Sequence, residues 1–340
     1  MKGASFIMTV NQKEVEVSII IPAHNAEPFI TRCLQSIQCQ TFKDFRVLIV
    51  ENASTDHTVD KVLAFVSKDK RFTLLSSPIS GVSNARNLGL REAHSEFVTF
   101  IDADDFVTKN HLQVLIDHIT SAETDMVVTG FSYETEKGKV IKAISALNSK
   151  LSSEDAIRSS YDFNGIQGVV WNKIFRKSII DKHNIQFDAS IPKYEDHKFV
   201  VTYLIHCHQV SCENVITYHY IKHPTSSLLT VQTSLIQDLD VYLAMRKMII
   251  NQGFRDIKEY VDIPLQMIVL NHYWHPVDSK DKMDAAQRMI SKRFMVRNLF
   301  RTSPKIKLKF LFALISLIFF WTKWELIRIV KREDGDKISR

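Results

Sequence analysis

The sequence has few glycines, and none where a glycine-rich nucleotide-binding loop would need them. It has nine in 340 residues, and none lies between Gly3 and Gly81. Dinucleotide-binding and P-loop proteins need glycines in the turn after the first strand, because backbone amides approach the phosphates there. Since the first strand pattern, at 17–21, is followed by no such turn, both classes of nucleotide site are excluded.

Cysteine and secretory features are also scarce. The four cysteines have neither CxxC spacing nor the density of a disulfide scaffold, which favours a reducing compartment. The first 16 residues lack an apolar core long enough for a secretory signal, so we expect a cytoplasmic protein. The histidines show no zinc spacing, because His206 and His208 are followed by no second ligand pair.

The net charge of +6 is concentrated near the C-terminal end of the sequence. Residues 301–340 carry ten Lys/Arg against four Asp/Glu, and the balanced remainder disfavours a nucleic-acid binder. An apolar run at 310–321 would form a helix of about 18 Å, shorter than the hydrocarbon core of about 30 Å. Basic residues flank it, so we expect residues 304–340 to lie on an anionic membrane surface. The alternative is a helix packed on the main domain.

Strand and helix patterns alternate over the first 130 residues. Apolar side chains at Ile30, Cys33, Leu34 and Ile37 follow helical spacing. Continuous apolar strands joined by amphipathic helices predict an α/β fold with a parallel sheet covered on both faces. Ligands bind such sheets outside the carboxyl ends of the strands. The expected strands are 17–21, 45–50, 72–75, 97–101 and 125–131.

The stretch FVTFIDADDF ends an apolar strand with Asp102, Asp104 and Asp105. Carboxylates this close raise one another's pKa unless a positive charge lies among them. One interpretation is a polar turn and a helix cap, and we expect Asp105 to be such a cap rather than a partner that supports the metal ligands. The other is a divalent cation held against a phosphate, for which Asp102 and Asp104 offer the hard oxygen ligands that suit Mg²⁺ or Mn²⁺.

Three motifs in this order carry a resemblance to a known family. VSIIIPAHNAEPFITRCLQSIQCQTFKDFRVLIVENASTD, GVSNARNLGL and FVTFIDADD resemble the family 2 glycosyltransferases of the GT-A fold, over roughly residues 15–130. VVWNKIFRKSII and YEDHKF resemble, more weakly, the acceptor half of that family. The resemblance implies a mostly parallel, Rossmann-like sheet covered by helices. The apolar pattern beyond residue 231 predicts a helical C-terminal extension. The resemblance also implies metal-dependent, inverting transfer of a hexosyl or N-acetylhexosaminyl group from a UDP-sugar, with Mn²⁺ or Mg²⁺, to a saccharide or lipid-linked saccharide acceptor.

The resemblance implies donor-binding residues one by one. Arg86 would reach the uracil or the diphosphate, Asp102 would lie near the ribose and the metal, and Asp104 would ligate the metal. The family's VDDGSTD is here VENASTD, so Glu51 and Asn52 stand where two aspartates are usual. Both can still bind a base edge, but the nucleobase is left open. The remaining donor residues are Pro22, Ala23, Asn25, Glu27 and Ala103.

The acceptor half would supply the catalytic base. An inverting transfer needs a carboxylate that takes the acceptor's proton, and the resemblance gives this role to Asp196, with Glu195 as the alternative. His197 is interpreted as structural. Lys222 or His223 would cover the diphosphate. Trp171 would stack on the acceptor sugar or lie in the core.

These expectations give five segments and one leading function. The segments are an extension at 1–14, the nucleotide-sugar half at 15–130, the acceptor half at 131–230, a helical extension at 231–303 and the tail at 304–340. The function would be bacterial lipopolysaccharide, capsule or other surface-glycan synthesis, on the inner face of the plasma membrane. The alternatives are a sugar nucleotidyltransferase, which normally needs a glycine-rich loop, and a catalytically degenerate binding partner.

Overall fold

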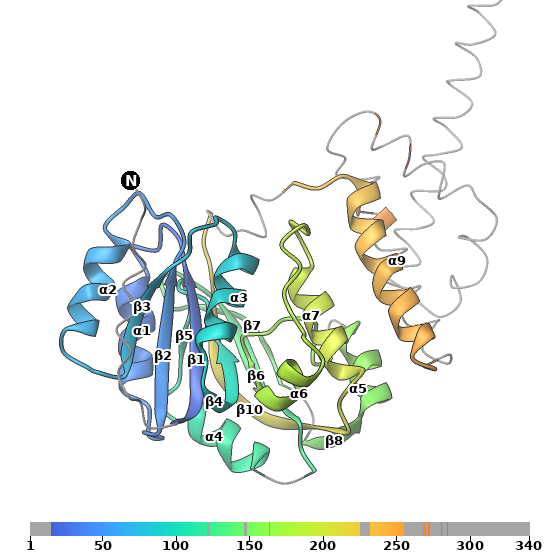
Figure 1. Ribbon diagram of the computed structural model, residues 1–340, viewed down its shortest axis with the longest axis horizontal. Helices are drawn as coiled ribbons and strands as arrows, with labels where there is room; N and C mark the ends of the chain where they lie inside the picture. Colours follow the sequence, from blue (N-terminus) through green and yellow to red (C-terminus); the bar gives the residue numbers. More distant parts are fainter. Residues whose placement is uncertain are drawn as a thin grey trace, which may run out of the picture. The chain divides into compact units, whose positions relative to one another are not determined.

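The computed structural model describes residues 15–254 apart from 121–122, 146–147, 163 and 225–231, and in addition 268–269, 271–272, 280 and 284. The chain divides into two compact units, Met1–Ser227 and Leu228–Arg340. The first contains the sheet in Figure 1. In the second, α9 (Leu235–Asn251) begins with a capping box formed by Ser234 and Gln237. The predicted extension at 1–14 and the tail at 304–340 lie outside the described residues.

Four strands of the first unit form the parallel sheet that the apolar runs predicted. They are β1 (Val15–Ala23), β2 (Phe45–Glu51), β3 (Phe72–Ser76) and β4 (Ser95–Phe100), in the spatial order β3-β2-β1-β4. The helices α1 (Ile30–Gln38), α2 (Thr58–Val66) and α3 (Val82–Glu92) connect them (Figure 1). The expected α/β sheet is confirmed in this half.

The second half of the sheet continues through an antiparallel strand. The strand β9 (Lys173–Arg176) lies between β4 and β6 (Met126–Thr135) and is antiparallel to both, whereas β10 (Gln209–Lys222) is parallel to β6. Consequently β1, β2, β3, β4, β6 and β10 all end at one edge. Three short strands pair antiparallel at the periphery: β5 (Phe106–Val107), β7 (Val140–Ile144) and β8 (Ser149–Ser152).

Four further helices complete the described part of this unit. They are α4 (His111–Ile119), α5 (Ser153–Ser160), α6 (Lys177–Lys182) and α7 (Glu195–Leu204). Ser152 caps α5 by accepting a hydrogen bond from the Asp155 backbone amide. No helix in the described parts of the chain is long and apolar enough to cross a membrane.

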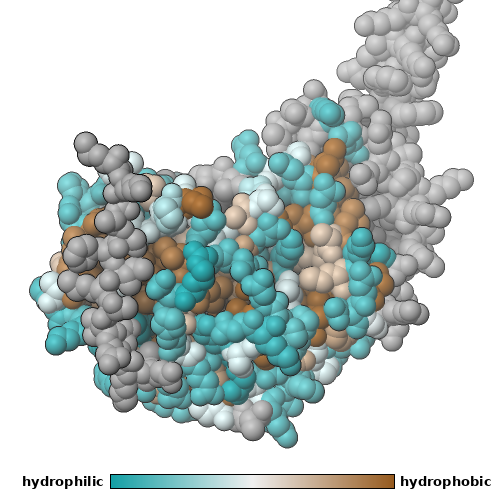
Figure 2. All heavy atoms as spheres, in the orientation of Figure 1, coloured by the Kyte–Doolittle hydropathy of each residue, from teal (hydrophilic) through white to brown (hydrophobic). Residues whose placement is uncertain are grey.

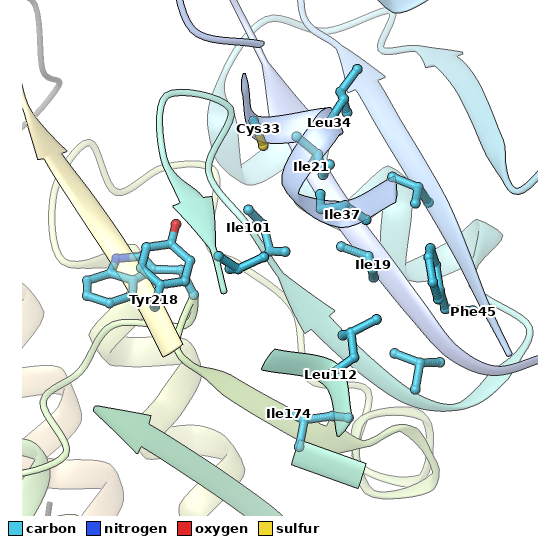
Figure 3. Close-up of a cluster of buried hydrophobic side chains, with 14 of the residues drawn as sticks. Ile19, Ile21, Cys33, Leu34, Ile37, Phe45, Ile101, Leu112, Ile174 and Tyr218 are labelled. Carbon is cyan, nitrogen blue, oxygen red and sulfur yellow. The ribbon is translucent and has the colours of Figure 1, made fainter. Parts of the chain in front are cut away.

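The core forms where the helical stripe of α1 meets the sheet. Ile30, Cys33, Leu34 and Ile37 are all buried, in one cluster with Ile19, Ile21 and Phe45 (Figure 3). Burying each such aliphatic side chain contributes about 1.5–3 kcal/mol. Much of the outer face in view in Figure 2 is hydrophilic, with smaller hydrophobic areas between.

Candidate active site

The ends of β1 and β2 carry the first group of predicted donor residues. Ala23 lies opposite Glu51 in the register, and the Ala23 carbonyl accepts a hydrogen bond from the Asn52 amide at 2.9 Å. Pro22 precedes Ala23 in the same strand and is half-buried. The parallel sheet therefore brings these segments together, as expected.

Three of these side chains hold loop backbone in this structure. The Asn25 side-chain oxygen accepts from the Thr55 amide at 2.8 Å, and Glu27 accepts from the His57 amide at 3.1 Å. Glu51 accepts from the Ser54 amide. The loops after β1 and β2 are thus tied to each other, so the segment beside any bound nucleoside has a fixed shape.

Asn52 connects the end of β2 to the start of α3. It is buried, and its side-chain oxygen accepts from the Gly81 amide at 3.1 Å. Gly81 has φ of 119°, a conformation that side chains rarely adopt, which explains a glycine there. His24, which the motif comparison did not single out, is exposed in the same loop, and its Nδ1 contacts the Asn52 carbonyl oxygen at 2.7 Å. Its only signal in the sequence is its place between Ala23 and Asn25.

Arg86 joins three carboxylates from two distant parts of the chain. Its guanidinium donates to Asp196 at 2.6 Å and Asp102 at 3.0 Å, and its Nη1 lies 3.3 Å from Glu195. The arginine side chain is 4% exposed. Arg86 comes from α3, Asp102 follows β4, and the other two carboxylates begin α7. The structure therefore brings together the residues predicted to bind donor and those predicted to supply the base.

The residues around Arg86 in the GVSNARNLGL motif fix its position. The Asn87 side chain donates to the Phe187 carbonyl at 2.8 Å and accepts from the Phe187 amide at 2.9 Å. The Phe187 ring in turn lies 5.3 Å from the Arg86 guanidinium. A Cβ on Gly89 would lie 2.4 Å from the Ile20 side chain, so a glycine lets α3 pack closely on β1.

The electrostatics of this cluster favour a proton on Asp196. Burial raises the pKa of Asp196 to about 8, Arg86 opposes this, and the charges of Glu195 and Asp102 add to it. Burial also raises the pKa of Asp102, again against Arg86. One guanidinium cannot neutralise three carboxylates. A carboxylate whose pKa is near 8 is suited to proton transfer close to neutral pH.

Asp104 pairs with a histidine from the far end of the second half. Its Oδ2 lies 2.7 Å from the Nε2 of His223, whose buried ring packs 4.5 Å from Phe29. A carboxylate oxygen suits Mg²⁺ or Mn²⁺ and an imidazole nitrogen also binds divalent metals, so this pair would supply two ligands to a cation in place of its mutual contact. Within the described ranges, no three His, Cys, Asp or Glu side chains are grouped to hold a metal ion.

Asp105 is not the helix cap that we expected. It is fully buried and accepts hydrogen bonds from the Tyr218 hydroxyl at 2.7 Å and from the Ile221 amide at 2.8 Å. The Tyr218 oxygen also accepts from the Asp102 amide at 3.2 Å. Asp105 thus attaches β10 to the turn formed by Asp102, Ala103 and Asp104. This attachment brings His223, which follows β10, to Asp104. Ala103, between the aspartates, is buried.

Of the two interpretations of Trp171, the core position is the one observed. It is 3% exposed and stacks on Tyr218 at 4.4 Å. His197 is buried against Gly168 and lies 3.1 Å from Ser160 Oγ, which fits a structural role. Lys222 is exposed, with its Nζ 4.6 Å from the Tyr133 ring, whereas its neighbour His223 contacts Asp104. Lys222 and His223, the two alternatives for covering the diphosphate, therefore contact different parts of the structure.

The sequence matches the family model described as glycosyl transferase family 2 over residues 18–183. This stretch contains most of β1, the helix α3 with Arg86, and the turn with Asp102 and Asp104. Residues 18–183 belong to glycosyl transferase family 2. The predicted family is thus confirmed for these residues, which include Arg86, Asp102 and Asp104. The partners of these residues in the site, Glu195, Asp196 and His223, lie beyond the matched stretch.

Bacterial relatives extend the likeness beyond the family domain. EpsH of Bacillus subtilis (strain 168) is 28% identical over 225 residues, 65% of each chain. The poly(ribitol-phosphate) beta-N-acetylglucosaminyltransferase TarS of Staphylococcus aureus (strain Mu50 / ATCC 700699) is 23% identical over 255 residues, 72% of this chain and 42% of TarS. The matches span less than two thirds of the length of either relative.

Solved structures confirm the GT-A type of fold. S. aureus TarS 1–349 in complex with UDP-GlcNAc has a TM-score of 0.66 at 20% identity, covering 81% of this chain and 79% of that one. A mannosyltransferase from Pyrobaculum calidifontis, in complex with GDP-Man and Mn²⁺, has a TM-score of 0.54 at 14% identity, covering 90% and 88%. At these identities the likeness concerns the fold.

Proposed function

We propose that this glycosyltransferase moves a sugar, with inversion, from a UDP-sugar to a saccharide acceptor of a bacterial surface polymer. The observation that carries this is the Arg86 cluster, which joins the donor-side Asp102 to the paired carboxylates Glu195 and Asp196. The UDP-GlcNAc in the TarS structure, and the polymer acceptor in its name, support the donor and acceptor classes. An N-acetylhexosamine is the first sugar to test.

In this mechanism Asp196 is the base. The acceptor hydroxyl lies against Asp196, which takes its proton as the oxygen attacks the anomeric carbon. The bond from that carbon to the diphosphate oxygen breaks, and attack on the opposite face inverts the configuration. Arg86 holds Asp196 by the 2.6 Å hydrogen bond and Asp102 by the 3.0 Å one, so base and donor keep a fixed relation.

Asp104 and His223 are the residues that would hold a divalent cation. The cation, when bound, neutralises the charge of the departing diphosphate. Asp102 lies beside this pair on the same turn, but in this structure its Oδ1 accepts from Arg86. We assign it to the ribose and to the edge of the metal site.

A donor screen tests the proposal. The full chain is incubated with UDP-, GDP- and dTDP-sugars and Mn²⁺ or Mg²⁺, and released nucleoside diphosphate is measured. We expect a UDP-sugar to be consumed, by slow hydrolysis without acceptor and faster with it. If folded protein with metal bound none of these nucleotides and consumed no donor, the chain would be a degenerate relative rather than an enzyme.

For residues 304–340 we propose attachment to an anionic membrane surface, on the sequence pattern alone. Each Lys or Arg near such a surface adds about 1 kcal/mol of attraction, which salt weakens, whereas salt does not weaken apolar contacts. We expect the full chain to sediment with anionic vesicles and to be released partly by high salt. A chain truncated before Pro304 should stay in the supernatant and still bind UDP. A truncated chain that unfolds would instead indicate a core helix.

A further inference from the structure

Because Trp171 lies in the core, it does not provide the aromatic surface for the acceptor that one of its two interpretations implied. A row of aromatic rings nevertheless runs outward from it. Trp171 stacks on Tyr218, its ring centre lies 5.7 Å from that of Tyr220, and Tyr220 lies 5.3 Å from Tyr133. Tyr133 and Tyr220 are partly exposed, whereas Trp171 and Tyr218 are buried. The outer two rings are therefore the ones that a ligand can contact.

These two tyrosines lie at the catalytic edge of the sheet. They are register partners near the carboxyl ends of β6 and β10, which run in the same direction as β4 and its Asp102. Tyr218, two residues before Tyr220, is hydrogen-bonded to Asp105. The two rings thus belong to the acceptor half, and Tyr218 in the same strand as Tyr220 contacts the turn that carries Asp102.

Two lysines flank the pair of rings. Lys222 is exposed with its Nζ 4.6 Å from the Tyr133 ring. Lys142 is exposed and lies directly opposite Tyr133 in the β6–β7 pairing, so the two side chains emerge on the same face. The carboxylate of the next residue, Glu134, contacts His219, and alternation along the strand places it on the other face. This face is therefore positively charged beside its aromatic rings.

We propose that Tyr133, Tyr220, Lys142 and Lys222 form an acceptor subsite for a sugar unit that carries a phosphate or a carboxylate. The partly exposed Tyr220 ring would offer the apolar contact that the C–H face of a sugar needs, and Tyr133 would support it beside the Lys222 ammonium that lies over its ring. The two lysines would attract the negative charge of the ligand. The subsite rests on the proposed function, since it gives the class of acceptor for the same reaction. It also reassigns Lys222 from the donor diphosphate to the acceptor.

Three probes of equal ring size test the charge of the ligand. Glucose, glucuronic acid and glucose 6-phosphate are added to the full chain with Mg²⁺, with and without UDP, and binding is followed by saturation-transfer NMR. We expect both anionic probes to bind more tightly than glucose. Comparing them separates a carboxylate from a phosphate. Equal binding of all three probes would overturn the proposal.

Variants test the residues. Lys222→Ala should weaken the anionic probes about three-fold, a surface-charge effect, and Tyr220→Ala about five-fold, an aromatic-contact effect. Tyr220→Phe should retain binding. Lys150→Ala is the matched control, because Lys150 is exposed in β8 opposite the amino-terminal part of β10, away from this edge. Unchanged probe binding in both alanine variants would overturn the subsite.

The two proposals fail separately. UDP affinity, measured by calorimetry in the same samples, should be the same in the wild type, Lys222→Ala and Tyr220→Ala. Absence of UDP binding in the wild type would count against the proposed function. The probes are also measured without UDP. A preference for the anionic probes would therefore still support the subsite if the wild type did not bind UDP. A loss of UDP affinity in Lys222→Ala would return Lys222 to the donor side.

Discussion

Asp196→Asn is expected to lower kcat by about 10²–10⁴-fold, the usual contribution of a general base, with little change in UDP affinity. The asparagine side-chain oxygen can still accept the hydrogen bond that Arg86 Nη1 donates at 2.6 Å, so the cluster keeps its geometry but loses the proton acceptor. Donor turnover and calorimetric UDP binding are the two measurements.

Glu195→Gln is the matched control, because Glu195 shares Arg86 Nη1 but at 3.3 Å. It should remain active. An inactive Glu195→Gln together with an active Asp196→Asn would make Glu195 the base.

The pH profile gives a second readout of the same assignment. Protonated Asp196 cannot accept a proton, so kcat/KM should rise with pH around its pKa of about 8. The charges near Asp196 are those of Arg86, Glu195, Asp102 and Lys173. Because the negative charge of Glu195 raises this pKa, Glu195→Gln should move the rise to lower pH. A shift to higher pH would contradict the assignment.

Asp104→Ala is expected to abolish metal-dependent turnover while the protein stays folded. A cation that neutralises a departing diphosphate contributes several kcal/mol, so we expect a loss of at least about 10³-fold. Asp104 is partly exposed and its side chain contacts His223, so its removal costs little core packing. Turnover and Mn²⁺ titration of the UDP complex measure the effect. Unchanged turnover would remove Asp104 from the metal site.

Asp105→Ala separates this effect from damage to the turn. It would leave the Tyr218 hydroxyl and the Ile221 amide without their acceptor, at a cost of about 2–4 kcal/mol in the free energy of unfolding. We therefore expect a lower melting temperature for Asp105→Ala and an unchanged one for Asp104→Ala.

The donor half could be predicted because its signals are local. Apolar runs defined β1, β2, β3 and β4, and a parallel sheet places their ends at one edge by its construction. The family resemblance carried by GVSNARNLGL pointed to Arg86. The sequence could not show that Arg86 would contact Glu195 and Asp196, because those residues are more than 100 positions away.

The acceptor half was less predictable because tertiary contacts decide it. Asp105 has the sequence context of a cap, yet β10 covers it and makes it an anchor. Trp171 and Lys222 stand in polar or aromatic stretches in which apolar residues do not recur at a regular spacing. The side of the sheet on which each side chain lies is decided only when β9 inserts between β4 and β6. An antiparallel strand of four residues, Lys173–Arg176, gives too little pattern to reveal that insertion.

The configuration of the first product tests the central claim most directly. An α-linked UDP-sugar that the screen identifies is hydrolysed by the enzyme without acceptor, so that water is the attacking group. Proton NMR of the released sugar is recorded during the first turnovers, before its α- and β-anomers equilibrate. If Asp196 is a base that activates the attacking oxygen, the first product is the β-anomer, and Asp196→Asn forms it far more slowly. An α-anomer as first product would contradict inverting transfer and the role of Asp196.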